Sequence, residues 1–259
     1  MAERVLRVET ADRIATLTID RPQKRNALNA QVRREIVEAL DALRDDDDAR
    51  VLILTGAGEQ AFVAGADIGE FAARTAVEQR AAMQGRSPFE ELAAFPKPTI
   101  AMIRGWALGG GCELALACDL RIAARSARLG QPEIRLGLLP GGGGTQRLPR
   151  LVGYGQALRL ILSGEPVEAV EAARIGLVDL LVDEGELEAR TRALASAMAT
   201  HSSATLRLAK AAVRAALEKP LTEGLAYERE LFLGAFASAD GAEGVRAFLE
   251  KRAPVFTGR

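Results

Sequence analysis

The chain has 259 residues and contains few of the side chains from which metal centres, disulfide frameworks and histidine-dependent catalytic triads are built. It has one histidine, His201, and two cysteines, Cys112 and Cys118, which lie in one apolar segment. The spacing of the cysteines matches neither a metal site nor a disulfide pattern. A lone histidine likewise supports neither a His/Cys metal site nor a Ser-His-Asp triad. We therefore expect structural cysteines, a reducing compartment, no metal ion and no redox cofactor.

Strong net charge and long apolar runs are also missing. The formal net charge is −1, which gives no electrostatic reason to expect nucleic acid or a membrane surface as a partner. No apolar run reaches the ~20 residues of a membrane span. Residues 1–4 lead into alternating, strand-like sequence and not into the apolar region of a signal peptide. We expect a cytoplasmic protein without nucleic-acid or membrane partners.

The first two thirds of the chain carry the pattern of an α/β core. Hydrophobic residues make up 48% of the chain and charged residues 27%, as in ordinary globular proteins. Alternating residues over 5–20 predict a hairpin, and Asn29 can cap a helix with apolar positions recurring every three or four residues. Short apolar runs at 51–54, 99–103 and 120–124 predict buried strands, each followed within ~20 residues by a Gly-rich turn or helix start. This order predicts a core wound from successive strand-strand-helix turns.

The remainder of the chain is predicted to be mostly helical. Helical spacing recurs at 154–162, 167–175, 187–198, 206–217, 221–236 and 242–251, with one short strand between 178 and 182. We divide the chain into a core of residues 1–195 and a helical region of residues 196–259. The helical region is expected to be an appendage of the core or an oligomerisation layer.

A carboxylate in an apolar helix is the most informative feature of the core. Glu113 follows three glycines, 109–111, on a helix that is otherwise apolar. Ionised carboxylates are almost never fully buried unless they are paired or hydrogen-bonded. An arginine such as Arg121 or Arg135 is one candidate partner. A second carboxylate, Glu133, stands in a turn twenty residues on, and four more glycines follow at 141–144.

These features together predict acid/base chemistry beside a backbone-built anion site. The small residues of 62–68 permit close approach of a ligand, and a backbone N–H from this loop could meet one from the helix start at Gly110. Two such donors form an oxyanion hole, and the helix dipole adds partial positive charge there. The glycines of 141–144 are compatible both with close ligand approach and with a simple tight connection.

Five ordered motifs resemble the crotonase superfamily, and specifically enoyl-CoA hydratase. They lie at 64–68, 97–101, 105–115, 130–133 and 140–148, and the resemblance extends from residue 21 to residue 252. It implies an α/β fold with a crotonase-like ββα spiral core and a C-terminal helical trimerisation region. It also implies a homohexamer made of two trimers.

The resemblance assigns roles to four residues. The N–H groups of Ala66 and Gly110 match the oxyanion hole that holds the thioester carbonyl of an acyl-CoA. Glu113 matches the base toward a water molecule, and Glu133 matches the acid toward the α-carbon. The implied reaction is the reversible syn addition of water to a trans-2-enoyl-CoA in fatty-acid or related acyl-CoA degradation. Two carboxylates around one water repel, so one should bind a proton more readily than the other.

The resemblance also implies where the CoA part of the substrate binds, and no cofactor beyond that substrate. The residues that match CoA or substrate contacts are Lys24, Arg25, Ala27, Ala64, Asp67, Ile68 and Gly141. On its own, the Lys24-Arg25 pair is more typical of a solvated turn.

The stretch 69–96 is less typical of the family, which uses it to shape the acyl pocket. Its large apolar residues, and Trp106 beside the glycines, are by spacing more typical of core packing than of substrate contact. The large apolar residues of the stretch are Phe71, Met83, Phe89, Leu92 and Phe95.

Three other functions stay open at this point. An enoyl-CoA isomerase that moves a double bond needs the oxyanion hole and only one carboxylate. A hydratase for a branched substrate such as methylglutaconyl-CoA would need a cation facing the distal carboxylate. A non-catalytic or RNA-associated scaffold is disfavoured by the near-neutral charge and by the presence of both glutamates.

Overall fold

The predicted N-terminal hairpin forms one edge of a six-stranded sheet in the computed structural model, which describes residues 4–72 and 74–259. β1 (Leu6–Ala11) and β2 (Ile14–Ile19) pair antiparallel, and all further neighbours in this sheet are parallel. The other strands are β3 (Val51–Gly56), β5 (Thr99–Ile103), β7 (Leu120–Ala124) and β10 (Leu180–Val182). Their order is β1-β2-β3-β5-β7-β10.

A second sheet has four strands, three of which directly follow strands of the first sheet in the sequence. Its order is β4 (Ala61–Val63), β6 (Trp106–Leu108), β8 (Arg128–Gly130) and β9 (Val167–Glu168). The consecutive pairs β3-β4, β5-β6 and β7-β8 each give one strand to each sheet before the chain enters a helix. The predicted strand-strand-helix winding is therefore confirmed. Because β4, β6 and β8 run parallel, the loops that follow them lie at the same edge of the second sheet.

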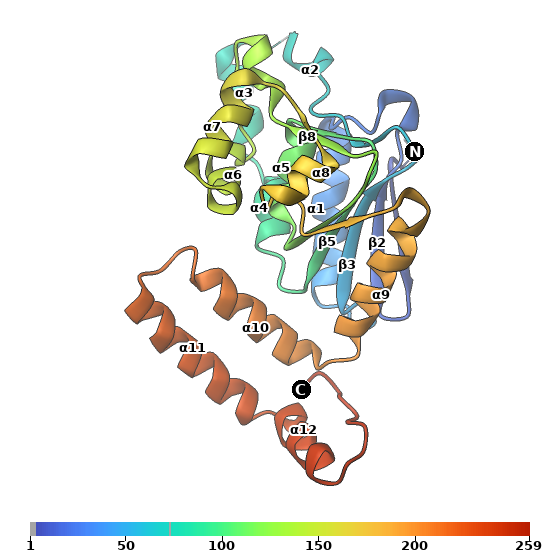
Figure 1. The fold of residues 1–259 in the computed structure, drawn as a ribbon, viewed down its shortest axis with the longest axis vertical. Coiled ribbons are helices and arrows are strands. Elements are labelled where there is room, and N and C mark those ends of the chain that lie inside the picture. The colour runs from blue at the N-terminus through green and yellow to red at the C-terminus, as the bar shows by residue number, and fades with distance from the viewer. Residues whose placement is uncertain (1–3, 73) are drawn as a thin grey trace.

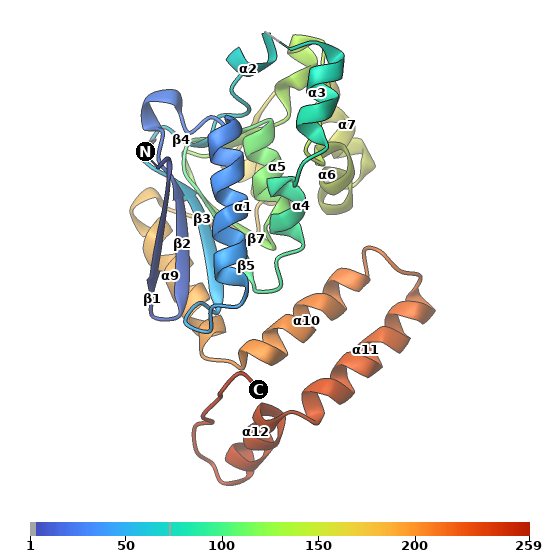
Figure 2. The ribbon, with the colours of Figure 1, turned by 180° about the vertical axis from the view of Figure 1, so that it is seen from behind.

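Both faces of the larger sheet are covered, which explains its continuous apolar runs. Leu52 and Leu54 of β3 belong to one core cluster, shared with α1 (Ala30–Arg44), whereas Val51 and Ile53 belong to the other, shared with α9 (Leu187–Ala199). Figures 1 and 2 show α9 and α1 on opposite sides of the sheet. Burying each such side chain contributes about 1.5–3 kcal/mol.

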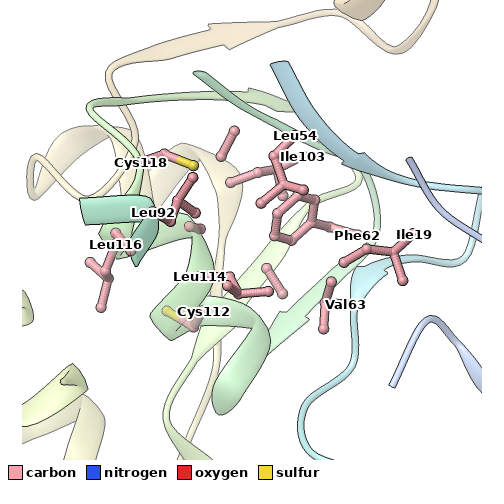
Figure 3. Packing of buried hydrophobic residues seen from close by; sticks show 14 of the residues in the cluster. Ile19, Leu54, Phe62, Val63, Leu92, Ile103, Cys112, Leu114, Leu116 and Cys118 are labelled. Carbon is pink, nitrogen blue, oxygen red and sulfur yellow. The ribbon is translucent and has the colours of Figure 1, made fainter. Parts of the chain in front are cut away.

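The helix that carries Glu113 lies inside the first of these clusters. All eight residues of α5 (Gly110–Ala117) are buried, including Cys112, whose thiol is free, as is that of Cys118. Figure 3 shows Phe62 of β4 directed toward Leu54 and Ile103 of the larger sheet, with Leu114 of α5 nearby. Because α5 is enclosed on every side, its N-terminal turn is held firmly in place.

Shorter helices precede and follow α5 in the sequence, and two of them, α4 (Pro88–Ala93) and α6 (Gly144–Val152), pack against it. Before it come η1 (Pro22–Lys24), α2 (Gly69–Ala72), α3 (Ala76–Met83) and α4, and after it η2 (Pro132–Leu136), α6, α7 (Tyr154–Ser163), α8 (Ala169–Arg174) and η3 (Glu184–Glu186). The helix predicted at 167–175 is wrong in its first two residues. Val167 pairs with Leu129 of β8, so the chain enters the sheet as β9 before the helix begins at Ala169.

The last three helices extend away from the sheets: α10 (Ser203–Ala215), α11 (Leu221–Phe236) and α12 (Ala239–Leu249). Figure 2 shows α10 and α11 side by side, below the rest of the molecule. Lys210 of α10 reaches the core through Asp119 at 2.6 Å and the carbonyl of Lys97 at 2.9 Å. Ala195 and Ala199, on either side of the boundary expected between residues 195 and 196, both belong to α9 and pack on the sheet. Within the described ranges, no helix is both long and apolar enough to cross a membrane.

Candidate active site

Two backbone amides from distant segments meet at the N-terminus of α5. Leu28 donates its N–H to the carbonyl of Gly65 (2.8 Å) and accepts from the N–H of Asp67 (3.0 Å). Since successive N–H groups in such a ladder point to opposite sides, the N–H of Ala66 points away from Leu28. A Cβ placed on Gly110 would stand 3.6 Å from the nitrogen of Ala66. Among the residues that the structure describes, neither of these two amides has a hydrogen-bond acceptor.

Arg21 holds both sides of this arrangement. Its guanidinium donates to the carbonyl of Ala27 at 2.5 Å and lies 3.2 Å from Oδ2 of Asp67. Ala27 and Asp67 are the residues next to Leu28 and Ala66, which form an isolated parallel bridge. Arg21 therefore fixes the register that aims the Ala66 amide. The sequence reasoning missed Arg21, whose only signal is its place before Pro22.

Glu113 lies one turn into α5 and is 3% exposed. Its Oε1 accepts the N–H of Gly142 at 2.6 Å and that of Gly144 at 2.8 Å. Burial raises the pKa of Glu113 above its usual value, and the two amide donors oppose that increase. The partner is therefore the glycine loop. Arg121, one of the arginines considered above, instead pairs with Asp179 at 2.6 Å.

The glycine loop owes its shape to further contacts that the sequence did not indicate. Arg147 of α6 donates to the carbonyl of Gly142 at 2.8 Å, and its positive charge lowers the pKa of Glu113. A Cβ on Gly142 would come within 2.7 Å of Oε2 of Glu113, so only glycine fits there. The glycines of 141–144 do permit a close approach, and the group that approaches them is the carboxylate of Glu113.

Glu133 approaches α5 from η2. A Cβ on Gly109 would stand 3.0 Å from Oε1 of Glu133, which places this carboxylate against the residue before Gly110. Burial is the main reason why the pKa of Glu133 rises to about 7, and the negative charge of Glu113 adds to the effect. The amide of Gln131, which is fully buried, lies 3.0 and 3.2 Å from the two carboxylate oxygens when its nitrogen faces them. Gln131 is a second residue missed by sequence reasoning.

Four of the five large apolar residues of 69–96 divide into two groups. Leu92 and Phe95 are 1% exposed and belong to the core, as their spacing suggested. Met83 is 59% exposed, and its Cε lies 3.9 Å from the Cβ position of Gly141. Phe89 is half-buried, with ring atoms 3.8 Å from the Cβ position of Gly110 and 2.7 Å from that of Gly142. Phe89 thus stands between the oxyanion amide and the glycine loop.

The comparison with known families decides what this arrangement belongs to. The family model described as enoyl-CoA hydratase/isomerase matches residues 9–259 of the chain. The chain belongs to the enoyl-CoA hydratase/isomerase family. It is 48% identical over 259 residues to a probable enoyl-CoA hydratase of Mycobacterium tuberculosis, covering 100% of both chains. It is 43% identical to a crotonyl-CoA hydratase of Syntrophomonas wolfei, covering 97% of both.

The fold agrees with that family over the same length. The crystal structure of an enoyl-CoA hydratase from Bacillus anthracis superposes with a TM-score of 0.95 at 40% identity, covering 98% of this chain and 100% of that one. The crotonase-like ββα core expected from the sequence motifs is therefore confirmed.

Apart from Gly141, the remaining residues that the family resemblance singled out lie along two adjacent segments. The N–H of Ala64 donates to the carbonyl of Arg25 at 3.0 Å, which places 24–28 beside 64–68. Lys24, Arg25 and Gly141 are exposed, Ile68 is 48% exposed, and Ala27, Ala64 and Asp67 are half-buried. A cavity of about 560 Å³ lies between 22–26 and 57–61, and neither glutamate lines it.

Proposed function

We propose that this member of the family is an enoyl-CoA hydratase, which adds water to a trans-2-enoyl-CoA and yields a 3-hydroxyacyl-CoA. One observation carries the proposal: the carboxylates of Glu113 and Glu133 both lie at the N-terminus of α5, beside the amides of Ala66 and Gly110. Full-length relatives named as hydratases support the same activity.

The two amides polarise the substrate. The thioester oxygen accepts hydrogen bonds from Ala66 and Gly110, and the positive end of the α5 dipole favours the negative charge that develops on this oxygen. Electron withdrawal toward the carbonyl makes C3 electrophilic. By analogy with acyl-transfer enzymes, loss of one such donor costs about 10²–10³-fold in rate.

The two carboxylates divide the proton transfers. Oε1 of Glu113 is occupied by the glycine loop, which leaves Oε2 to accept a proton from water as the oxygen bonds to C3. Glu133 holds a proton at neutral pH more readily than an ordinary glutamate, because its pKa is about 7, and it delivers that proton to C2. After one turnover the proton resides on Glu113 and must return to Glu133.

The CoA part of the substrate is proposed to lie along the segments 24–28 and 64–68. Lys24 and Arg25 are exposed cations on the first segment, suited to phosphate groups. Ala64, Asp67 and Ile68 on the second, with Ala27 and Gly141, are proposed to contact the rest of the substrate. CoA thus arrives as part of the substrate, and we propose no further cofactor.

The helical region is proposed to assemble the chain into a hexamer of two trimers. Large apolar side chains of α11 and α12 are exposed, including Leu221 (77%), Phe236 (67%) and Phe248 (82%). Apolar surface of this kind usually marks an interaction site. Sedimentation at the mass of a single chain would refute this assembly. A cytoplasmic role in fatty-acid or related acyl-CoA degradation is part of the same proposal.

The activity is tested by offering crotonyl-CoA and a trans-3-enoyl-CoA in parallel. A hydratase converts crotonyl-CoA to a product heavier by one water, with loss of absorbance from the conjugated thioester. No reaction with enoyl-CoAs of any chain length would overturn the proposal. Conversion of the trans-3 substrate alone would identify an isomerase instead.

A further inference from the structure

The ring of Phe89 lies next to the atoms that the proposed reaction uses. A Cβ on Gly142 would stand 2.7 Å from Cε2 of Phe89 and also 2.7 Å from Oε2 of Glu113. The ring and the carboxylate oxygen are therefore at most twice that distance apart. Under the proposed function, the reacting water and C3 of the substrate occupy the neighbourhood of Oε2. Little room remains beyond C3 in the direction of the ring.

The same ring also borders the other side of the reacting thioester. Its Cζ lies 3.8 Å from the Cβ position of Gly110, whose amide holds the carbonyl oxygen. A substrate with its C1 oxygen at Gly110 and its C3 near Glu113 therefore has the ring of Phe89 beside its reacting carbons, next to the start of the acyl chain.

Phe89 is held by its surroundings and does not yield easily. It belongs to the first turn of α4, between Pro88, which is buried, and Leu92, which is 1% exposed. Its carbonyl accepts from Arg147 at 3.4 Å, the same arginine that holds the glycine loop. The half-buried side chain of Phe89 also packs against the core cluster, so displacing its ring requires a change in packing, which interiors resist.

We propose that Phe89 closes the acyl pocket and limits the enzyme to short-chain enoyl-CoAs, an inference that rests on the proposed hydratase function. Crotonyl-CoA, with a single carbon beyond C3, fits in front of the ring. A longer chain must displace the ring or turn away from it. Discrimination between substrates that differ by a methylene in an apolar pocket is about 10–200-fold.

The test compares kcat/KM for crotonyl-CoA, hexenoyl-CoA and decenoyl-CoA in the wild type, Phe89→Ala and Phe89→Leu. We expect the wild type to prefer crotonyl-CoA over decenoyl-CoA. In Phe89→Ala the ratio of decenoyl-CoA to crotonyl-CoA should rise at least about tenfold, the lower end of that discrimination. Phe89→Leu, which keeps more of the packing, should shift the ratio in the same direction and serves if the alanine variant does not fold.

Leu92→Ala is the matched control, because it removes a side chain from the same helix on the core side. It should lower the melting temperature and leave the chain-length ratio unchanged. A wild-type enzyme that hydrates decenoyl-CoA as well as crotonyl-CoA would overturn the inference, and would indicate that long chains leave past the exposed Met83. An unchanged ratio in both Phe89 variants would overturn it as well. Failure of the wild type on all three substrates would instead count against the hydratase function itself.

Discussion

A change of pH should affect hydration and dehydration identically, and the proposed reaction, with one proton shared by two carboxylates, agrees with this. Hydration requires Glu133 protonated and Glu113 ionised, whereas dehydration requires the reverse. Both states of the pair hold the same number of protons. The overall reaction neither takes up nor releases a proton, so its equilibrium constant does not vary with pH. Therefore kcat/KM must follow one bell-shaped curve in both directions.

The position of the alkaline limb follows from the structure. Burial, with the charge of Glu113 in addition, raises the pKa of Glu133 from 4.5 to about 7. Above that value the pair loses its last proton, so kcat/KM should fall about tenfold per pH unit, to roughly one hundredth at pH 9. On the acidic side, protonation of Glu113 limits the rate, and because burial raises its pKa, that limb lies above the range of an ordinary glutamate.

The assay measures initial rates with crotonyl-CoA and with 3-hydroxybutyryl-CoA between pH 5 and 9, each at concentrations well below KM. Such rates report the protonation of the free enzyme. A profile that stays level up to pH 9 would refute the assignment of Glu133 as a proton donor with a raised pKa. Equal limbs in the two directions follow from the constant equilibrium constant under any mechanism, so that agreement checks the assay, and the position of the alkaline limb tests the proton donor.

Three further substitutions test other contacts. Gly142→Ala places a Cβ 2.7 Å from Oε2 of Glu113; we expect kcat to fall about 10²-fold or more with a folded protein, as judged by circular dichroism. Arg21→Met releases the segments that aim the Ala66 amide, so a bound dienoyl-CoA chromophore should show a smaller red shift and kcat should fall about tenfold or more. An unaltered red shift would contradict the role given to Arg21. Lys97, whose ammonium donates to the carbonyls of Leu43 and Asp46 at 2.6 Å, has its pKa lowered by burial from 10.5 to about 8. Between these two values the unfolded chain binds the proton that the folded chain has released, so stability must rise with pH there. In urea unfolding, the free energy of unfolding of the wild type relative to that of Lys97→Met should therefore increase from pH 7 to pH 10. An equal difference at the two pH values would contradict the burial of that charge.

Secondary structure was predicted most accurately where the local pattern of apolar residues matches the burial of that segment in the fold. The run at 51–54 is apolar on both faces because α1 and α9 cover both faces, so its reading as a buried strand was confirmed. Asn29 does cap α1, since its side chain accepts from the N–H of Val32. The helix at 167–175 failed at its start because the pairing of Val167 with Leu129 depends on a strand far away in the sequence.

The candidate site was less predictable, because its parts come from segments far apart in the chain. Family motifs pointed to Glu113 and Glu133, but nothing local identified the partner of Glu113. That partner is a pair of backbone amides 29 and 31 residues away, and a glycine carries no side-chain signal of such a role. Phe89 had the spacing of a core residue, and only the packed structure separates it from Leu92, one helical turn further on.

Hydration by the glutamate variants tests the central claim most directly. Crotonyl-CoA turnover and binding are to be measured side by side for wild type, Glu113→Gln and Glu133→Gln. Each carboxylate is proposed to move one proton, and general acid/base help is worth about 10²–10⁴-fold, so each variant should lose that much in kcat while binding a CoA ester nearly as tightly as wild type. A Glu133→Gln enzyme that hydrates crotonyl-CoA at the wild-type rate would contradict the two-carboxylate mechanism.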